Sequence, residues 1–139
     1  MKKTTLFLNA LFLTIAIQAQ TFTGTGGAIS DNLDTTYFLL NISTLNPPFL
    51  NNAYGLEEAC INITHIKDND LDIYLESPGG TRVELTTDNG GTGDNYITIC
   101  FRQDATTLIT NGTAPFNGSY RPEQKLSLLN NGLNGNGIW

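Results

Sequence analysis

Two acidic turns hold the residues of this sequence that are best suited to chemistry. Asp68, Asn69 and Asp70 follow one another in the first turn, and the second, DNGGTGDN over residues 88–95, adds carboxylate and amide oxygens. Calcium prefers clustered oxygen ligands of this kind. No glutamate stands at the twelfth position counted from Asp88, so the loop is not an EF-hand. An irregular calcium site and ordinary turn chemistry, in which Asp and Asn bond their own backbone, both stay open.

Three aspartates are the candidate calcium ligands: Asp88, Asp94 and Asp104. The first two lie in the glycine-rich turn, and Asp104 follows the next predicted strand. The hypothesis predicts that removal of calcium with EDTA lowers the melting temperature of the protein.

The sequence does not show the residues of a serine-protease triad. His65 is the only histidine, and no Gly-x-Ser-x-Gly or Gly-Thr-Ser motif occurs. His65 alternates in phase with Ile61 and Ile63, which predicts a buried structural imidazole in a strand. We therefore expect no catalytic residues and no peptidase activity from the chain alone.

The N-terminus has the pattern of a secretory signal peptide. Lys2 and Lys3 precede an apolar stretch, and Ala19 offers a small residue before the cleavage point. We predict that residues 1–19 are removed and that residues 20–139 form one domain. The protein is then secreted or held at the cell surface.

The charge of the chain limits its partners. The whole sequence carries a net charge of −6 at pH 7. Loss of the two N-terminal lysines leaves five basic and 13 acidic residues, a net charge of −8. An acidic surface of this kind argues against nucleic acid and against an anionic membrane as partner.

The two cysteines, Cys60 and Cys100, lie at comparable places in two predicted strands. Each is out of phase with its apolar neighbours, so both are predicted on the polar side of their strands. Export favours a disulfide between them. Two separate thiols remain the alternative, because spacing alone does not fix how the strands pair.

Short apolar runs separated by Gly, Pro, Asn and Asp predict an all-β domain. Period-two alternation is clearest from Cys60 to Leu85, where strand, acidic turn, strand, tight turn and strand follow one another. Strands are predicted over 36–45, 58–66, 70–76, 81–87, 96–101, 108–109 and 126–129. Residues 113–122 are predicted to form an aromatic-bearing loop. Near-regular strand spacing favours a sandwich or jelly roll.

Several ordered motifs resemble the P domain, also called Homo B, of kexin- and furin-like subtilisin proteases, in its bacterial secreted variety. That domain follows the catalytic domain in these proteases. The motifs span most of the chain after the signal peptide and are Ile63-Thr64-His65, Asp70-Leu71, Ser77-Pro78-Gly79-Gly80-Thr81, the glycine-rich turn, Pro115-Phe116-Asn117-Gly118-Ser119-Tyr120-Arg121-Pro122 and Gly137-Ile138-Trp139.

The resemblance implies a jelly-roll, galactose-binding-like β-sandwich. Gly137-Ile138-Trp139 is similar to the opening of the family's final strand, so we expect a C-terminally truncated domain that lacks this strand. It also implies calcium, although Arg102 and Gln103 depart from the family's acidic pattern before Asp104.

Function follows from the resemblance rather than from a visible site. It implies a non-catalytic accessory module that binds or stabilises the catalytic domain of a subtilisin-like serine endopeptidase. The alternative is a carbohydrate-binding jelly roll, with Tyr96, Phe116 and Tyr120 as the aromatic platforms.

Overall fold

A computed structural model describes residues 19–29 and 35–139 of the chain. All of the predicted signal peptide except Ala19 lies outside the described residues. Within them, no helix has the length and apolar character that crossing a membrane requires. The elements in chain order are β1 (Asn41–Ile42), β2 (Glu58–Ile63), the 3-10 helix η1 (Asp68–Asp70), β3 (Asp72–Glu76), β4 (Arg82–Thr87), β5 (Tyr96–Arg102), η2 (Ile109–Asn111), β6 (Phe116–Tyr120), η3 (Leu126–Leu129) and β7 (Gly137–Ile138).

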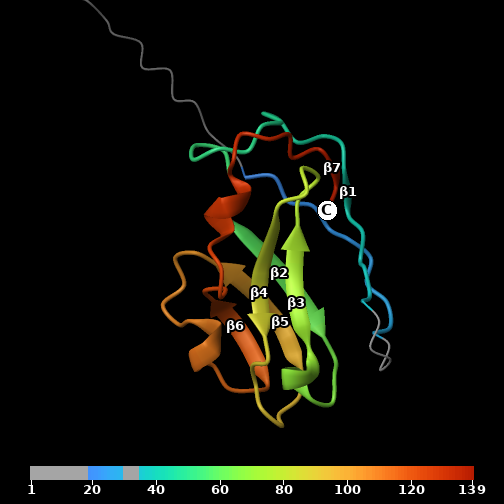
Figure 1. Ribbon diagram of the computed structural model, residues 1–139, viewed down its shortest axis with the longest axis vertical. Helices are drawn as coiled ribbons and strands as arrows, with labels where there is room; N and C mark the ends of the chain where they lie inside the picture. The colour runs from blue at the N-terminus through green and yellow to red at the C-terminus, as the bar shows by residue number, and fades with distance from the viewer. Residues whose placement is uncertain (1–18, 30–34) are drawn as a thin grey trace, which may run out of the picture.

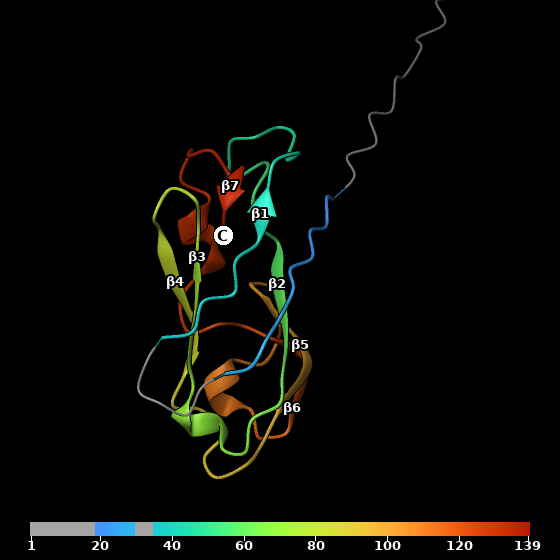
Figure 2. The ribbon, with the colours of Figure 1, turned by 90° about the vertical axis from the view of Figure 1, so that its right-hand side faces the viewer.

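The strands form two facing layers, which Figure 2 shows edge-on. β3 and β4 pair antiparallel in one layer, in front in Figure 1. In the other layer, β5 lies between β2, to which it is antiparallel, and β6, to which it is parallel. A short antiparallel ladder joins β1 to β7 near the C-terminus. The predicted all-β sandwich is confirmed.

Alternating side chains of the two layers build the core between them. In β2 and β3 the apolar residues face inward and the polar ones outward, as the period-two pattern predicts. Each fully buried aliphatic or aromatic side chain stabilises the fold by roughly 1.5–3 kcal/mol. The buried cluster comprises Leu71, Val83, Leu85, Tyr96, Ile99, Phe101, Ile109, Phe116, Leu126 and Leu129.

An irregularity in β5 reverses part of its predicted alternation. Thr98 has a φ of 51°, and the pairing registers with β2 and with β6 both shift around it. Strict alternation would place Ile97 inside with Ile99, yet Ile97 is 48% exposed and Tyr96 is completely buried. A bulge adds a residue to one strand, so the side chains before it change faces.

Two segments adopt structures that differ from the predicted ones. Residues 126–129, predicted as a strand, form η3, because Leu126 and Leu129 stand three residues apart and are both buried. Residues 116–120, predicted within a loop, form β6, whose parallel pairing with β5 a local pattern does not reveal. Ile109, predicted in a strand, begins η2.

The predicted strand 36–45 is much shorter than expected. Only Asn41 and Ile42 pair as a strand, with β7, and Leu40 exchanges two backbone hydrogen bonds with Trp139. Tyr37 and Leu39 precede this ladder as exposed, extended chain. The segment therefore presents apolar side chains to solvent.

Cys60 and Cys100 form a disulfide between β2 and β5, with an S–S distance of 2.09 Å. The antiparallel register places them directly opposite each other. Their shared place on the outward side of the strands, read from the alternation, agrees with this pairing. The pairing left open by the sequence is thereby decided in favour of the disulfide.

Candidate functional site

The two acidic turns meet at one end of the sandwich, at the bottom of Figure 1. The backbone N–H of Asp68 donates to the carbonyl of Gly93 at 2.9 Å. Asn95, with a φ of 73°, accepts the His65 N–H on Oδ1 at 3.0 Å and returns its own N–H to the His65 carbonyl at 3.2 Å. The turn after β2 and the loop before β5 are thus held together by two backbone–backbone hydrogen bonds and one to the Asn95 side chain.

Asp68 is completely buried where these turns meet. Neither of its carboxylate oxygens makes a hydrogen bond within residues 19–29 and 35–139. Burial raises the pKa of the Asp68 carboxyl, and the nearby Asp94 carboxylate raises it further. The backbone N–H of Asn95 lies near enough to lower this pKa in part, although its hydrogen bond goes to the His65 carbonyl. A buried carboxyl group without hydrogen-bond donors is stabilised either by a nearby positive charge or by protonation.

Tyr96, the first residue of β5, is a second buried polar residue near Asp68. Its hydroxyl is buried and forms no hydrogen bond of acceptable geometry with any described residue, although Thr86 lies close enough to lower its pKa. Burial and the Asp68 carboxylate nevertheless raise the pKa of Tyr96 to about 12. The Tyr96 hydroxyl therefore stays protonated and lies within electrostatic reach of Asp68.

Gly90 allows the glycine-rich turn, residues 88–95, to pack directly against Asp68. A Cβ atom at Gly90 would fall 2.8 Å from the Asp68 Cβ and 2.8 Å from the Phe116 ring, and its φ is +90°. We expect Gly90→Ala to destabilise the fold by about 2–4 kcal/mol in urea unfolding, since strain and overpacking add. Gly91→Ala is the matched control, because φ is +59° there but no atom lies within 4 Å of the Cβ. Equal losses in both variants would contradict the close contact.

The three aspartates predicted as calcium ligands are not brought together. Asp94 lies in the loop that covers Asp68, and Asp88 is an exposed residue with a φ of 53° after β4. Asp104 follows the opposite end of β5, and a seven-residue strand spans roughly 20 Å. Asp104 pairs there with Arg102 at 2.9 Å, which lowers the pKa of its carboxyl.

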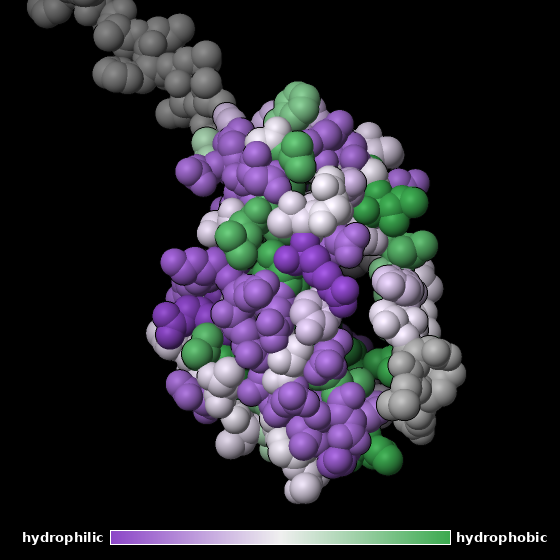
Figure 3. Space-filling view, in the orientation of Figure 1, coloured by the Kyte–Doolittle hydropathy of each residue, from purple (hydrophilic) through white to green (hydrophobic). Residues whose placement is uncertain are grey.

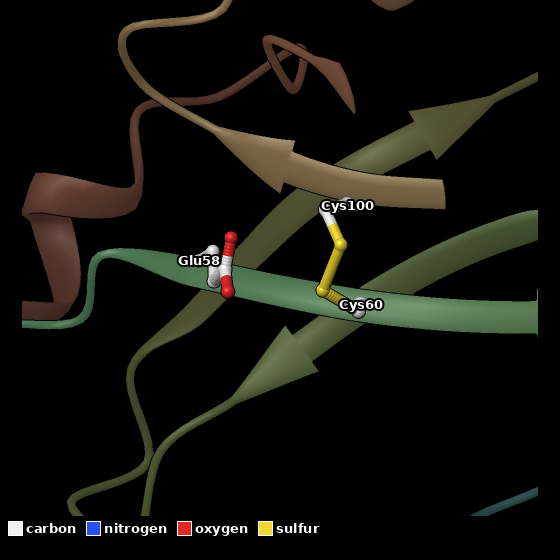
Figure 4. A group of neighbouring side chains, drawn as sticks. All are labelled: Glu58, Cys60 and Cys100. Carbon is white, nitrogen blue, oxygen red and sulfur yellow. A yellow bond between two sulfur atoms is a disulfide. The ribbon is translucent and has the colours of Figure 1, made fainter. Parts of the chain in front are cut away.

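Another acidic group lies beside the disulfide on the outer side of β2 and β5. Figure 4 shows the Glu58 carboxylate next to the Cys60 and Cys100 sulfur atoms. Both sulfur atoms are consumed by the disulfide and cannot act as thiolate ligands. Glu58 instead accepts a hydrogen bond from Arg102 at 3.1 Å, so this group is structural.

The predicted carbohydrate platforms are wrong for two of the three aromatic residues. Tyr96 and Phe116 are completely buried and stacked, with ring centroids 4.8 Å apart. Tyr120 is half-buried and meets Phe116 edge-to-face at 5.7 Å. A ring whose faces pack inside the core offers no surface for a sugar.

His65 does not lie in a strand as predicted, because β2 ends at Ile63. Its ring Nδ1 lies 2.9 Å from the Lys67 carbonyl oxygen, and the residue is half-buried. The prediction that this side chain points into the core from a strand is therefore wrong, because the chain leaves β2 two residues earlier. Among the described residues, nothing places a nucleophilic serine against this ring.

The importance of Asp68 was missed because the sequence treats it as one polar turn residue among several. Only the covering loop, contributed from more than twenty residues away, removes it from solvent. The exposed apolar residues Tyr37 and Leu39 were missed because their segment reads as an ordinary strand. No local sequence signal marks either feature.

A comparison with protein-family models matches the central part of the chain. The family model described as "Proprotein convertase P-domain" matches residues 58–112. The matched segment runs from β2 to the end of η2 and contains both acidic turns, the disulfide and most of the core strands. No curated protein and no solved structure matches the chain.

Proposed function

We propose that the chain is a non-catalytic module that binds and stabilises a subtilisin-like serine endopeptidase domain, because residues 58–112 match the model of the proprotein convertase P-domain. The family match is the observation that carries the proposal. P domains are accessory domains of subtilisin-like proprotein convertases, and they occur in secreted proteins. Their role is therefore exerted through contact with another folded domain.

The mechanism is mass action on the stability of the partner. A module that binds only the folded catalytic domain shifts its folding equilibrium by RT ln(1 + [L]/Kd), which is about 2.7 kcal/mol at 100 times Kd. The peptide bond that the protease cleaves does not contact this chain in such a mechanism. The active site, with its triad, belongs to the partner in this proposal.

An exposed apolar surface offers a place for such a contact. Tyr37 and Leu39, which are 72% and 64% exposed, adjoin Ile138, which is 57% exposed. They line a mainly apolar hollow of about 120 Å³ together with Glu76 and Trp139. We call these five residues the Tyr37 surface. Figure 3 shows hydrophobic residues along the right-hand segment leading to β1, whereas the front layer is mainly hydrophilic.

The Tyr37 surface has the composition of a protein contact. Aromatic and aliphatic residues concentrate at the centre of interfaces, whereas scattered charges surround them. Without the signal peptide the net charge is −8, from five basic and 13 acidic residues, and this charge adds long-range attraction to a partner with a basic docking face. We propose that the catalytic domain docks on the Tyr37 surface.

We further propose that the protein is exported through its predicted signal peptide. The disulfide between Cys60 and Cys100 is consistent with an extracellular location, because reducing compartments do not maintain such bonds. Detection of the Ala19–Gln20 cleavage by N-terminal sequencing of the exported protein would support this route, whereas an intact Met1 would contradict it.

A binding experiment tests the proposed contact. The probe is a subtilisin-like catalytic domain from which its own P domain has been removed. The chain should raise the melting temperature of this probe, and the variant carrying Tyr37→Ser and Leu39→Ser should bind at least about tenfold more weakly. Leu128→Ser is the matched control, because Leu128 is 53% exposed in η3, outside the Tyr37 surface.

Two outcomes would overturn parts of this proposal. Equal binding by the double variant and the control would remove the Tyr37 surface as the docking site. Peptide hydrolysis by the pure chain, in the presence of inhibitors that block contaminating proteases, would remove the non-catalytic role.

A further inference from the structure

The buried side-chain oxygen atoms without hydrogen-bond partners among the described residues belong to only three residues. In the part of the chain that the structure describes, these atoms are both carboxylate oxygens of Asp68, Oδ1 of Asn69 and the hydroxyl of Tyr96. Buried polar atoms are almost always paired in folded proteins, so each exception calls for a cause. Here the exceptions are neighbours in sequence or within electrostatic reach of one another.

A buried carboxylate is costly unless a positive charge compensates it. The nearest lysine does not do so, because the Lys67 Nζ lies 2.6 Å from Asp70 Oδ1 in an exposed ion pair. His65 favours the charged form of Asp68 electrostatically but donates no hydrogen bond to its carboxylate. The exposed Asp94 carboxylate adds a second negative charge beside Asp68. The site therefore gathers negative charge around oxygen atoms that lack donors.

We propose that Asp68 and Asn69, together with Asp94 of the facing loop, hold a hard divalent cation, foremost Ca²⁺. All of their ligand atoms are oxygens, and two carboxylates match the charge of such an ion. Asp68 supplies the buried side of the site, and exposed Asp94 supplies the side from which the ion enters. This set shares only Asp94 with the aspartates predicted from the sequence.

The glycine-rich turn packs directly against the proposed cation site. Gly90 approaches Asp68 so closely that a Cβ atom would lie 3.4 Å from its Oδ2. The Gly93 carbonyl fixes the start of η1, and Asn95 fixes the chain at His65. The cation therefore ties the turn after β2 to the loop before β5, and its binding energy becomes stability of the fold.

Thermal unfolding of the full exported chain in Ca²⁺ and in EDTA tests the site. At a Ca²⁺ concentration of 100 times Kd, the ratio of folded to unfolded protein should rise about 100-fold over that in EDTA. Mg²⁺ at the same concentration should act more weakly, because it demands a stricter geometry. Identical melting curves in Ca²⁺ and EDTA would overturn the proposal and leave Asp68 as a protonated core residue.

The isosteric variant Asp68→Asn separates a ligand from a structural residue. It should abolish the stabilisation by Ca²⁺, yet melt above the wild-type protein in EDTA, since it removes an uncompensated buried charge. A merely structural Asp68 would give a loss in both solutions, and that result would overturn the proposal.

Two further variants keep the test valid if Asp68→Asn fails to fold. Asp94→Asn changes an exposed residue and should weaken Ca²⁺ binding about tenfold in titration calorimetry. Asp72→Asn is the matched control, because Asp72 is exposed on β3 and should leave the affinity unchanged. Equal affinities of Asp94→Asn and Asp72→Asn would contradict the ligand set. The experiment contains no protease, so its outcome is independent of the proposed function.

Discussion

Replacing Cys60 and Cys100 together by alanine should cost the fold about 4 kcal/mol. The disulfide closes a loop of 40 residues, and releasing a loop of this length gives the unfolded chain conformational entropy of that magnitude. For a domain of this size, the melting temperature should fall by roughly 10–20 °C. Calorimetry of the exported protein measures the change directly.

Wild-type protein in a strong reductant serves as the control for this prediction. It should melt within a few degrees of the double alanine variant, because both lack the same covalent link. A double variant that melts like the oxidised wild-type protein would show that the link between β2 and β5 adds nothing to stability.

Truncation of Phe116 to alanine should destabilise the protein by about 3–5 kcal/mol. The ring is completely buried, stacks on Tyr96 at 4.8 Å and meets Tyr120 edge-to-face at 5.7 Å. Its removal leaves a cavity where β6 and the glycine-rich loop pack together. Urea unfolding should show the loss as a lower midpoint with an unchanged slope.

Phe49→Ala removes the same atoms from a side chain that is 55% exposed. We expect a change within about 1 kcal/mol in this matched control, because little apolar area returns to water. Similar losses in the two variants would contradict the assignment of Phe116 to the core. Sugar binding lost in Phe116→Ala without loss of stability would revive the carbohydrate hypothesis.

The alternation of side chains predicted the layers well wherever strands follow a regular pleat. Ile73 and Leu75 face inward and Asp72 faces out, as read from the sequence. The same rule placed both cysteines on the outward side, which is where they pair. Period-two patterns work here because each of these strands buries one face only.

The rule failed where the backbone departs from the pleat. The left-handed conformation of Thr98, with φ at 51°, exchanges the expected places of Ile97 and Tyr96. β6 escaped prediction because Phe116 acquires its burial from a parallel strand that is distant in sequence. For these two reasons the sequence analysis predicted Tyr96 and Phe116 as exposed sugar-binding aromatics, whereas both are core residues.

The sequence by itself predicted the strand-rich fold and the resemblance to the P domain, and its single histidine and lack of a nucleophile motif led to the expectation of no catalytic triad. These follow from ordered motifs, alternation and residue types, all of which are local properties. Only the tertiary structure distinguished Asp68 from the other acidic residues of its turn. The physical reason is desolvation: the carboxylate of an ordinary turn residue becomes a buried group without hydrogen-bond donors only when a distant loop excludes water from it. Asp104, equally acidic in sequence, stays solvated and paired with Arg102 at the far end of β5.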